Sequence, residues 1–127
     1  MKNKGLTKED SEIIAFVAGC LLSGVITKDE LSQWAVHVIT KSDGDYPLYL
    51  LDLIDFNKPS ADIYNVIGFS PHWSFTNDDD KALYGIALKR GKTPYEKPCS
   101  PEEAFEKLDQ RPALLRHFKE IFPFVEI

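Results

Sequence analysis

Hydrophobic residues recur along most of this chain at the three- and four-residue spacing of an α-helix. In the clearest case, the apolar positions of one helical face are Leu31, Trp34, Ala35, Val38 and Ile39. Polar residues occupy the opposite face, and residues 42–45 interrupt the pattern. Thr27 and Glu30, three positions apart, have the spacing of a capping box. The pattern therefore predicts an amphipathic helix that begins after Thr27.

Start and stop signals predict further helices on either side of this one. Thr7 and Asp10 are placed like a capping box before an apolar stretch that Gly24 ends, and Ser100, Pro101 and Glu103 form the strongest helix start. The remaining expected helices run from Leu48 to Phe56 after Pro47, from Ala61 to Ile67 after Ser60, from Thr76 towards Gly91, and from Pro112 to Pro123. Their expected inward residues are Leu83, Ile86 and Ala87, then Ala104, Phe105 and Leu108, then Leu114, Leu115, Phe118, Ile121 and Phe122.

No segment alternates polar and apolar residues between hairpin turns, and no internal repeat is present. We therefore predict an all-α protein: a single compact domain of six or seven short helices over residues 1–127. The main alternative within this prediction is a small sheet formed by residues 64–69 and the C-terminal tail, residues 124–127.

The net charge of the chain and the length of its longest apolar run limit the kinds of partner that we expect. The formal net charge is −5 and the sequence pI is about 5.1, which argues against direct binding of nucleic acid and favours a basic partner or simple solubility. The apolar run from Ile13 to Ile26 is short for a bilayer and contains Ser23 and Gly24, so no membrane association is expected. Residues 17–20 look like a lipoprotein cleavage box, but acidic residues precede them where a signal needs positive charge. A cytoplasmic location is the expectation.

No catalytic motif, cofactor site or metal site is expected. The three histidines, His37, His72 and His117, lack metal-ligand spacing, and only His72 falls in an expected loop. Cys20 lies in an apolar run and reads as a core thiol, and a disulfide with Cys99 is open but unsupported. A general acid and base at Asp52 and Asp55, or a cation site at residues 78–80, are weaker interpretations than exposed charge and helix-start charge.

Binding is the remaining interpretation. Aspartates concentrate between Asp43 and Asp80, few basic residues lie among them, and aromatic residues are interspersed. Such a surface speeds encounter with a basic protein, while buried aromatic side chains slow its dissociation. Helix capping and solvated loops explain the aspartates equally well. The candidate partner-binding residues are Asp43, Asp45, Tyr46, Asp52, Asp55, His72, Trp73, Asp78, Asp79 and Asp80.

Two stretches resemble small helical immunity proteins of bacterial toxin systems, including those of contact-dependent growth inhibition. Residues 24–35 (GVITKDELSQWA) form a capped helix that reaches Trp-Ala, and residues 46–53 (YPLYLLDL) form a Pro-opened helix with an Asp-Leu pair. The resemblance covers the first half of the chain. It implies a cytoplasmic, non-enzymatic protein that binds a cognate toxin domain, here a nuclease with a basic, phosphate-binding cleft. Two alternatives stay open: a metal-dependent hydrolase that uses central carboxylates, and a regulatory adaptor.

Overall fold

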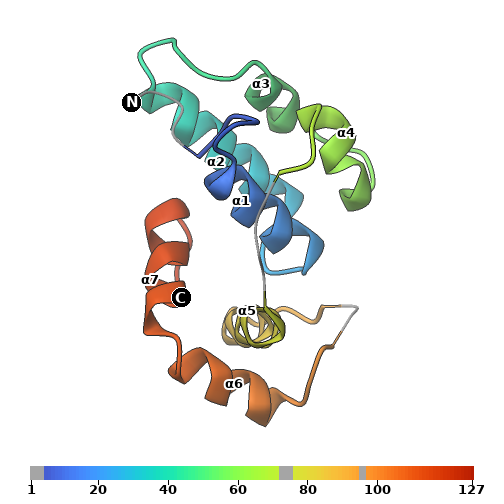
Figure 1. The fold of residues 1–127 in the computed structure, drawn as a ribbon, viewed down its shortest axis with the longest axis vertical. Coiled ribbons are helices and arrows are strands. Elements are labelled where there is room, and N and C mark those ends of the chain that lie inside the picture. Colours follow the sequence, from blue (N-terminus) through green and yellow to red (C-terminus); the bar gives the residue numbers. More distant parts are fainter. Residues whose placement is uncertain (1–4, 72–75, 95–96) are drawn as a thin grey trace. The chain divides into compact units, whose positions relative to one another are not determined.

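The computed structural model describes residues 5–71, 76–94 and 97–127. Within these ranges the regular structure is helical and no strand is present, which confirms the all-α prediction and rules out the small sheet among the described residues. The elements are α1 (Glu12–Leu22), α2 (Lys28–Lys41), α3 (Tyr49–Ile54), the 3₁₀ turn η1 (Ser60–Asp62), α4 (Ile63–Ile67), α5 (Asn77–Lys89), α6 (Pro101–Asp109) and α7 (Pro112–Ile121) (Figure 1).

The described residues fall into two compact units. Unit 1 contains residues 5–22 and 27–71, hence α1 to α4. Unit 2 contains residues 23–26 and the described residues from 76 onward, hence α5 to α7. The prediction that residues 1–127 form one domain stays a prediction.

In unit 1, α2 begins as its sequence predicts. The Glu30 amide donates to the Thr27 hydroxyl at 3.1 Å, and the Thr27 amide donates to the Glu30 carboxylate at 2.9 Å. This reciprocal pair satisfies two amides that the first turn of a helix leaves unbonded. Trp34 is buried, and the helix that carries it, α2, contacts α3 and α1. The cap thus fixes where the helix starts, and the apolar face fixes which side turns inward.

The start of α1 differs from the prediction. The Asp10 amide donates to the Thr7 hydroxyl at 3.2 Å, as at a cap, but this bond closes a turn and the helix begins only at Glu12. The turn is anchored from elsewhere in unit 1, because the buried Tyr49 hydroxyl donates to the Leu6 carbonyl at 2.5 Å. The predicted end is confirmed, since Gly24 has a φ of 75° after the last helical residue, Leu22.

Two other predicted helix starts are corrected. Pro47 does not occupy the first helical position, because Leu48 is the N-cap residue and α3 begins at Tyr49. Ser60 makes no side-chain cap bond; it opens η1, and α4 begins only at Ile63. Both segments are short, and a short helix gains too little from its own backbone for a local signal to set its boundary.

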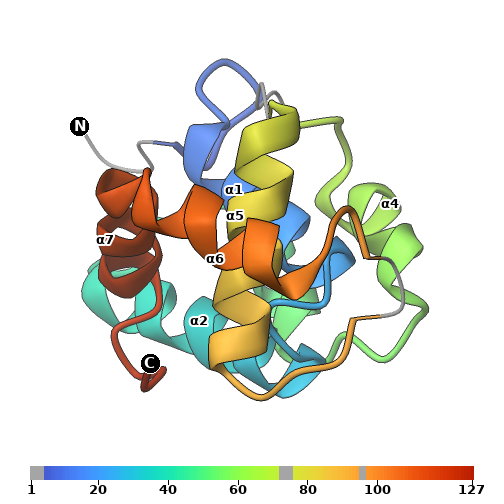
Figure 2. The same ribbon diagram turned by 90° about the horizontal axis from the view of Figure 1, so that it is seen from below.

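In unit 2, α6 crosses α5 at close range (Figures 1 and 2). A Cβ built on Gly85 would lie 2.8 Å from the backbone oxygen of Ala104, so the glycine permits the crossing. Residues 23–26 also belong to this unit: Val25 is buried, and the Arg90 guanidinium donates to its carbonyl oxygen. The predicted caps of α5 and α6 at Thr76 and Ser100 are confirmed.

The predicted inward faces hold in part: Phe105 is exposed, and Leu114, Leu115 and Ile121 of α7 are only partly buried. Leu83, Ile86 and Ala87 of α5, Ala104 and Leu108 of α6, and Phe118 and Phe122 at α7 are buried. Phe105 was expected to face inward but is 37% exposed, because the crossing with α5 turns the side of α6 that carries Ala104 and Leu108 inward. Cys20 is buried in α1, as expected of a core thiol. No helix in the described part of the chain has the length and apolar character needed to cross a bilayer.

Candidate protein-binding surface

The structure divides the predicted partner-binding residues between the two units. Asp43, Asp45, Tyr46, Asp52 and Asp55 belong to unit 1. The three consecutive aspartates, residues 78–80, belong to unit 2. His72 and Trp73 lie outside the described residues. The two acidic sets have different surroundings.

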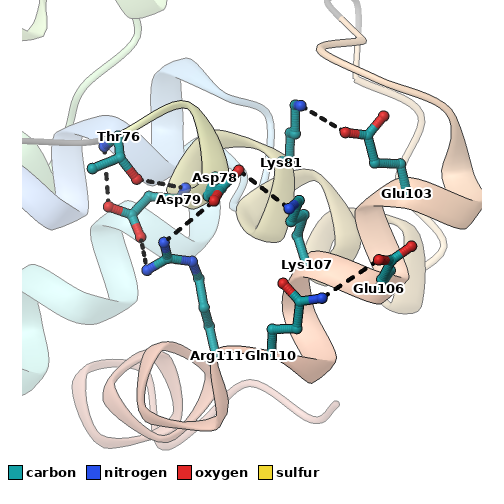
Figure 3. Close-up of polar contacts among 9 residues, drawn as sticks. All are labelled: Thr76, Asp78, Asp79, Lys81, Glu103, Glu106, Lys107, Gln110 and Arg111. Atoms are coloured by element: carbon teal, nitrogen blue, oxygen red, sulfur yellow. Dashed lines mark hydrogen bonds and ion pairs between the residues drawn. The ribbon is translucent and has the colours of Figure 1, made fainter.

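The aspartates of unit 2 occupy the first turn of α5, where the positive end of the helix dipole favours negative charge. Asp79 completes a capping box: its amide donates to the Thr76 hydroxyl at 3.1 Å, and its carboxylate accepts from the Thr76 amide at 3.0 Å (Figure 3). The predicted Thr76 cap therefore extends to a reciprocal bond with Asp79. This aspartate has a structural role in the helix that carries it.

Two basic residues, one in the last turn of α6 and one at the start of α7, neutralise the same turn of α5 (Figure 3). Arg111 lies 2.9 Å from the Asp79 carboxylate and 3.8 Å from that of Asp78, and Lys107 lies 3.5 Å from Asp78. Lys81 pairs with Glu103 at 2.6 Å on the same two helices. Burial, and then the neighbouring Asp79, raise the pKa of Asp80 above its ordinary value. Two of the three aspartates are thus engaged within unit 2.

Most of the net charge of the chain arises from unit 1. Residues 42–66, here called the acidic segment, carry five aspartates and one lysine, a formal charge of −4 out of −5 for the whole chain. The segment begins with the loop after α2, where Asp43 and Asp45 are exposed and Tyr46 is half-buried. Asp43 has a φ of 56°, a left-handed conformation that aspartate tolerates better than most residues. The segment then continues through α3 and α4.

The acidic segment contains an open groove with a volume of about 440 Å³. Leu51 and Asp52 of α3 line it, together with residues 55–58 and, from α4, Asn65 and Val66. The α3 and α4 helices lie side by side in unit 1 (Figure 1). We call this feature the α3–α4 groove. It unites two predicted residues, Asp52 and Asp55, while Asp43, Asp45 and Tyr46 lie outside its lining.

Leucines are exposed beside these two aspartates. Leu48 is 75% exposed and Leu51 is 46% exposed. Residues 48, 51, 52 and 55 are spaced at three, four and seven positions, which places them on one face of a helix. Neighbouring exposed leucines give this face an apolar area that another protein can cover. From the sequence, Leu48 is expected on the same outward face as Asp52 and Asp55, whereas Leu51 was assigned to no face and neither leucine was named as a candidate binding residue.

The two aspartates of the groove lie at different places in a short helix. Asp52 falls in the first turn of α3, whereas Asp55 is its C-cap residue, at the end of the helix where the dipole favours cations. Both are exposed, and among the described residues no ion pair or side-chain hydrogen bond engages either carboxylate. Asp78 and Asp79 of α5 are engaged in cap bonds or ion pairs, whereas Asp52 and Asp55 make no such contact among the described residues.

Other chemistry finds less support in the described residues. They contain no group of three or more histidine, cysteine, aspartate or glutamate side chains placed to hold a metal ion. Burial, and then Glu103, raise the pKa of the Cys99 thiol, which disfavours the nucleophilic thiolate. The exposure of Asp52 and Asp55 is unlike that of an acid–base pair, which depends on a cleft that excludes water.

Compared with known proteins, the chain matches no family model, no curated protein sequence and no solved structure.

Proposed function

We propose that this chain is a non-catalytic immunity protein that binds a basic toxin domain through the α3–α4 groove and the exposed leucines beside it. The observation that carries the proposal is the combination of two exposed aspartates, Asp52 and Asp55, which no ion pair or side-chain hydrogen bond among the described residues engages, with Leu48 and Leu51 on the same helical face. The toxin would be a nuclease whose phosphate-binding cleft is basic, and neutralisation would take place in the cytoplasm without a cofactor.

In this proposal the aspartates and the leucines affect different steps of binding. The charge of the acidic segment accelerates encounter with a positively charged surface, and added salt screens this effect. The leucines lose contact with water only in the complex, so their burial slows dissociation. The sequence resemblance to immunity proteins includes residues 46–53, and therefore most of α3.

The decisive experiment uses the toxin domain encoded beside this protein. We expect a complex with a nanomolar or lower Kd and protection of cells that produce the toxin domain. Replacing Asp52 and Asp55 together by asparagine should lower the association rate about tenfold at low salt. Leu48→Ser should instead raise the dissociation rate. The double variant Asp43→Asn and Asp45→Asn is the matched control: it removes the same charge from the acidic segment outside the groove, so it should lower the association rate less than the groove variant does.

The outcomes separate this proposal from its alternatives. Absence of both binding and protection would contradict it. Binding without protection would indicate a regulatory adaptor that uses the same groove. A metal-dependent hydrolase would require residues 78–80 to bind a divalent cation, and calorimetry with magnesium, calcium and manganese tests that directly. The ion pairs of Asp78 and Asp79 with α6 and Arg111 weigh against it.

A further inference from the structure

The lining of the α3–α4 groove combines hydrogen-bond acceptors with apolar side chains. Its acceptors are the carboxylates of Asp52 and Asp55 and the side-chain amides of Asn57 and Asn65. Its apolar lining consists of Leu51, Phe56 and Val66. Three successive parts of the acidic segment contribute: α3, the residues that follow it, and α4. A ligand that fits this lining has a cationic, donor-rich end and an aliphatic stem.

We infer that the groove binds one arginine side chain of the partner protein, an inference that rests on the proposed function and specifies its contact. A guanidinium group carries five N–H donors, forms two parallel bonds with a carboxylate and is more weakly hydrated than an ammonium group. Its three-methylene stem packs on apolar surface while its charged end reaches polar groups. Both properties match the lining.

The size and charge of the groove select against other occupants. A volume of about 440 Å³ holds one or two long side chains but not a helix, which with its side chains is about 10 Å wide. A second copy of this chain would bring its own acidic segment, whose formal charge of −4 repels an identical surface. Lysine offers only three donors on a strongly hydrated ammonium group, so it should bind more weakly than arginine.

Lys58 supplies an internal test of the inference. It lines the groove, is exposed, and among the described residues pairs with none of the carboxylates. Its ammonium group opposes an incoming cation, so its removal should strengthen arginine binding. Removal of Asp52 or Asp55 should weaken it. An effect of opposite sign within one groove distinguishes local recognition from loss of stability, which would weaken binding in every variant.

The experiment titrates the purified, ¹⁵N-labelled full chain with three small probes: N-acetylarginine amide, N-acetylcitrulline amide and N-acetyllysine amide. Citrulline has the shape of arginine without its charge. For ligands of this size we expect a Kd of about 1 to 10 mM for the arginine probe. The NMR shift changes should saturate at the backbone and side-chain amides of Asn57 and Asn65. The lysine probe should bind more weakly, and the citrulline probe should cause no saturable change.

The variants then locate the site. Asp52→Asn and Asp55→Asn should each weaken the arginine probe about two- to fivefold, and Lys58→Gln should strengthen it about twofold. Asp43→Asn, outside the groove, is the control and should change the Kd by less than either groove aspartate. Equal binding of citrulline, shift changes centred outside the groove, or weaker binding in Lys58→Gln would overturn the inference. Toxin neutralisation without arginine binding would overturn this inference alone, whereas arginine binding without neutralisation would overturn the proposed function alone.

Discussion

Gly85 has no side chain at the point where α5 and α6 cross, and the packing there depends on that absence. In the middle of a helix, alanine normally stabilises by about 1 kcal/mol relative to glycine. At this site the added Cβ would lie 2.8 Å from the Ala104 oxygen and 3.2 Å from the Leu108 Cβ. The first neighbour is backbone and does not move without the whole of α6.

We therefore expect Gly85→Ala to destabilise the protein by about 1–3 kcal/mol, the range for inserting a methyl group into a tightly packed site. The measurement is the free energy of unfolding from urea titration followed by circular dichroism. Ser32→Ala, on the partly exposed side of α2, is the comparison: there the helix preference of alanine meets no close backbone, and the change should be within about 0.5 kcal/mol. A more stable Gly85→Ala variant would show that α5 and α6 are not in this close contact.

His37 offers a residue-scale test of pH dependence. Burial, and then the Lys41 charge one turn later, hold the pKa of His37 below its ordinary value of 6.5. The unfolded chain thus binds this proton more readily than the folded chain. The folded state therefore keeps its full stability with respect to His37 above pH 6.5, where the imidazole is neutral in both states. This contribution to the free energy of unfolding is lost as the pH falls through 6.5 towards the folded-state pKa of His37.

Lys41→Gln should raise the pKa of His37 while leaving it below 6.5, because burial, the larger cause, remains. An NMR titration of the imidazole Cε1 proton measures this, and the spectrum of His37→Gln identifies the signal. Lys8→Gln removes the same charge from another exposed position and should leave the pKa unchanged. An unchanged pKa of His37 in Lys41→Gln would mean that the charge of Lys41 has no electrostatic effect on the imidazole.

At the scale of elements, the neighbouring aspartates at the start of α5 differ in how much each contributes to stability. Asp79 combines a capping bond with the 2.9 Å ion pair to Arg111, and its side chain is only 15% exposed. Asp78 is 44% exposed, and its two ion pairs are longer, at 3.5 and 3.8 Å. We expect Asp79→Ala to cost about 1–2 kcal/mol of stability and Asp78→Ala, the matched control, less than about 0.5 kcal/mol. Urea unfolding at low and high salt checks this, and equal losses would contradict the assignment.

Helix boundaries were predictable wherever a local hydrogen bond decided them. Thr27, Thr76 and Ser100 begin α2, α5 and α6 because each hydroxyl accepts an amide three residues ahead within the same segment. Thr7 makes the same bond to Asp10, yet the chain forms a turn there. What differs at Thr7 is tertiary: Gly5 and Leu6 accept hydrogen bonds from α1 and Tyr49, and a sequence window does not contain those partners.

The candidate site was predictable only in part, again because the deciding contacts come from residues distant in the sequence. The sequence locates Asp52 and Asp55, but their pattern alone does not separate them from residues 78–80. The difference lies in the partners that the fold supplies: Lys107 and Arg111 approach Asp78 and Asp79 from about 30 residues away, whereas no described residue engages the carboxylates of α3. Phe105 was misplaced likewise, because the crossing at Gly85 decides which side of α6 turns inward.

For the molecule as a whole, the chain path ties the two units together. The chain leaves unit 1 after α1, contributes residues 23–26 to unit 2, and returns to unit 1 at α2. Within unit 2, Val25 and Ile26 are buried, and Arg90 donates to the Val25 carbonyl. Unit 1 therefore has no uninterrupted stretch of chain that includes both α1 and α2. Loss of unit 2 would release the four residues that join these helices.

This chain path predicts that the two units unfold together, as one domain over residues 1–127 would. Gly85→Ala lies in unit 2, but it should lower the free energy of hydrogen exchange of the α2 amides by the same amount as that of the α5 amides. Tyr49→Phe is the reciprocal variant: it removes the bond to Leu6 within unit 1, at a cost of about 1 kcal/mol, and should lower protection in α5 equally. Native-state hydrogen exchange measures both. If each variant weakens only its own unit, the units are independent domains, and residues 23–26 are a linker that unit 2 binds without transmitting its stability to α1 and α2.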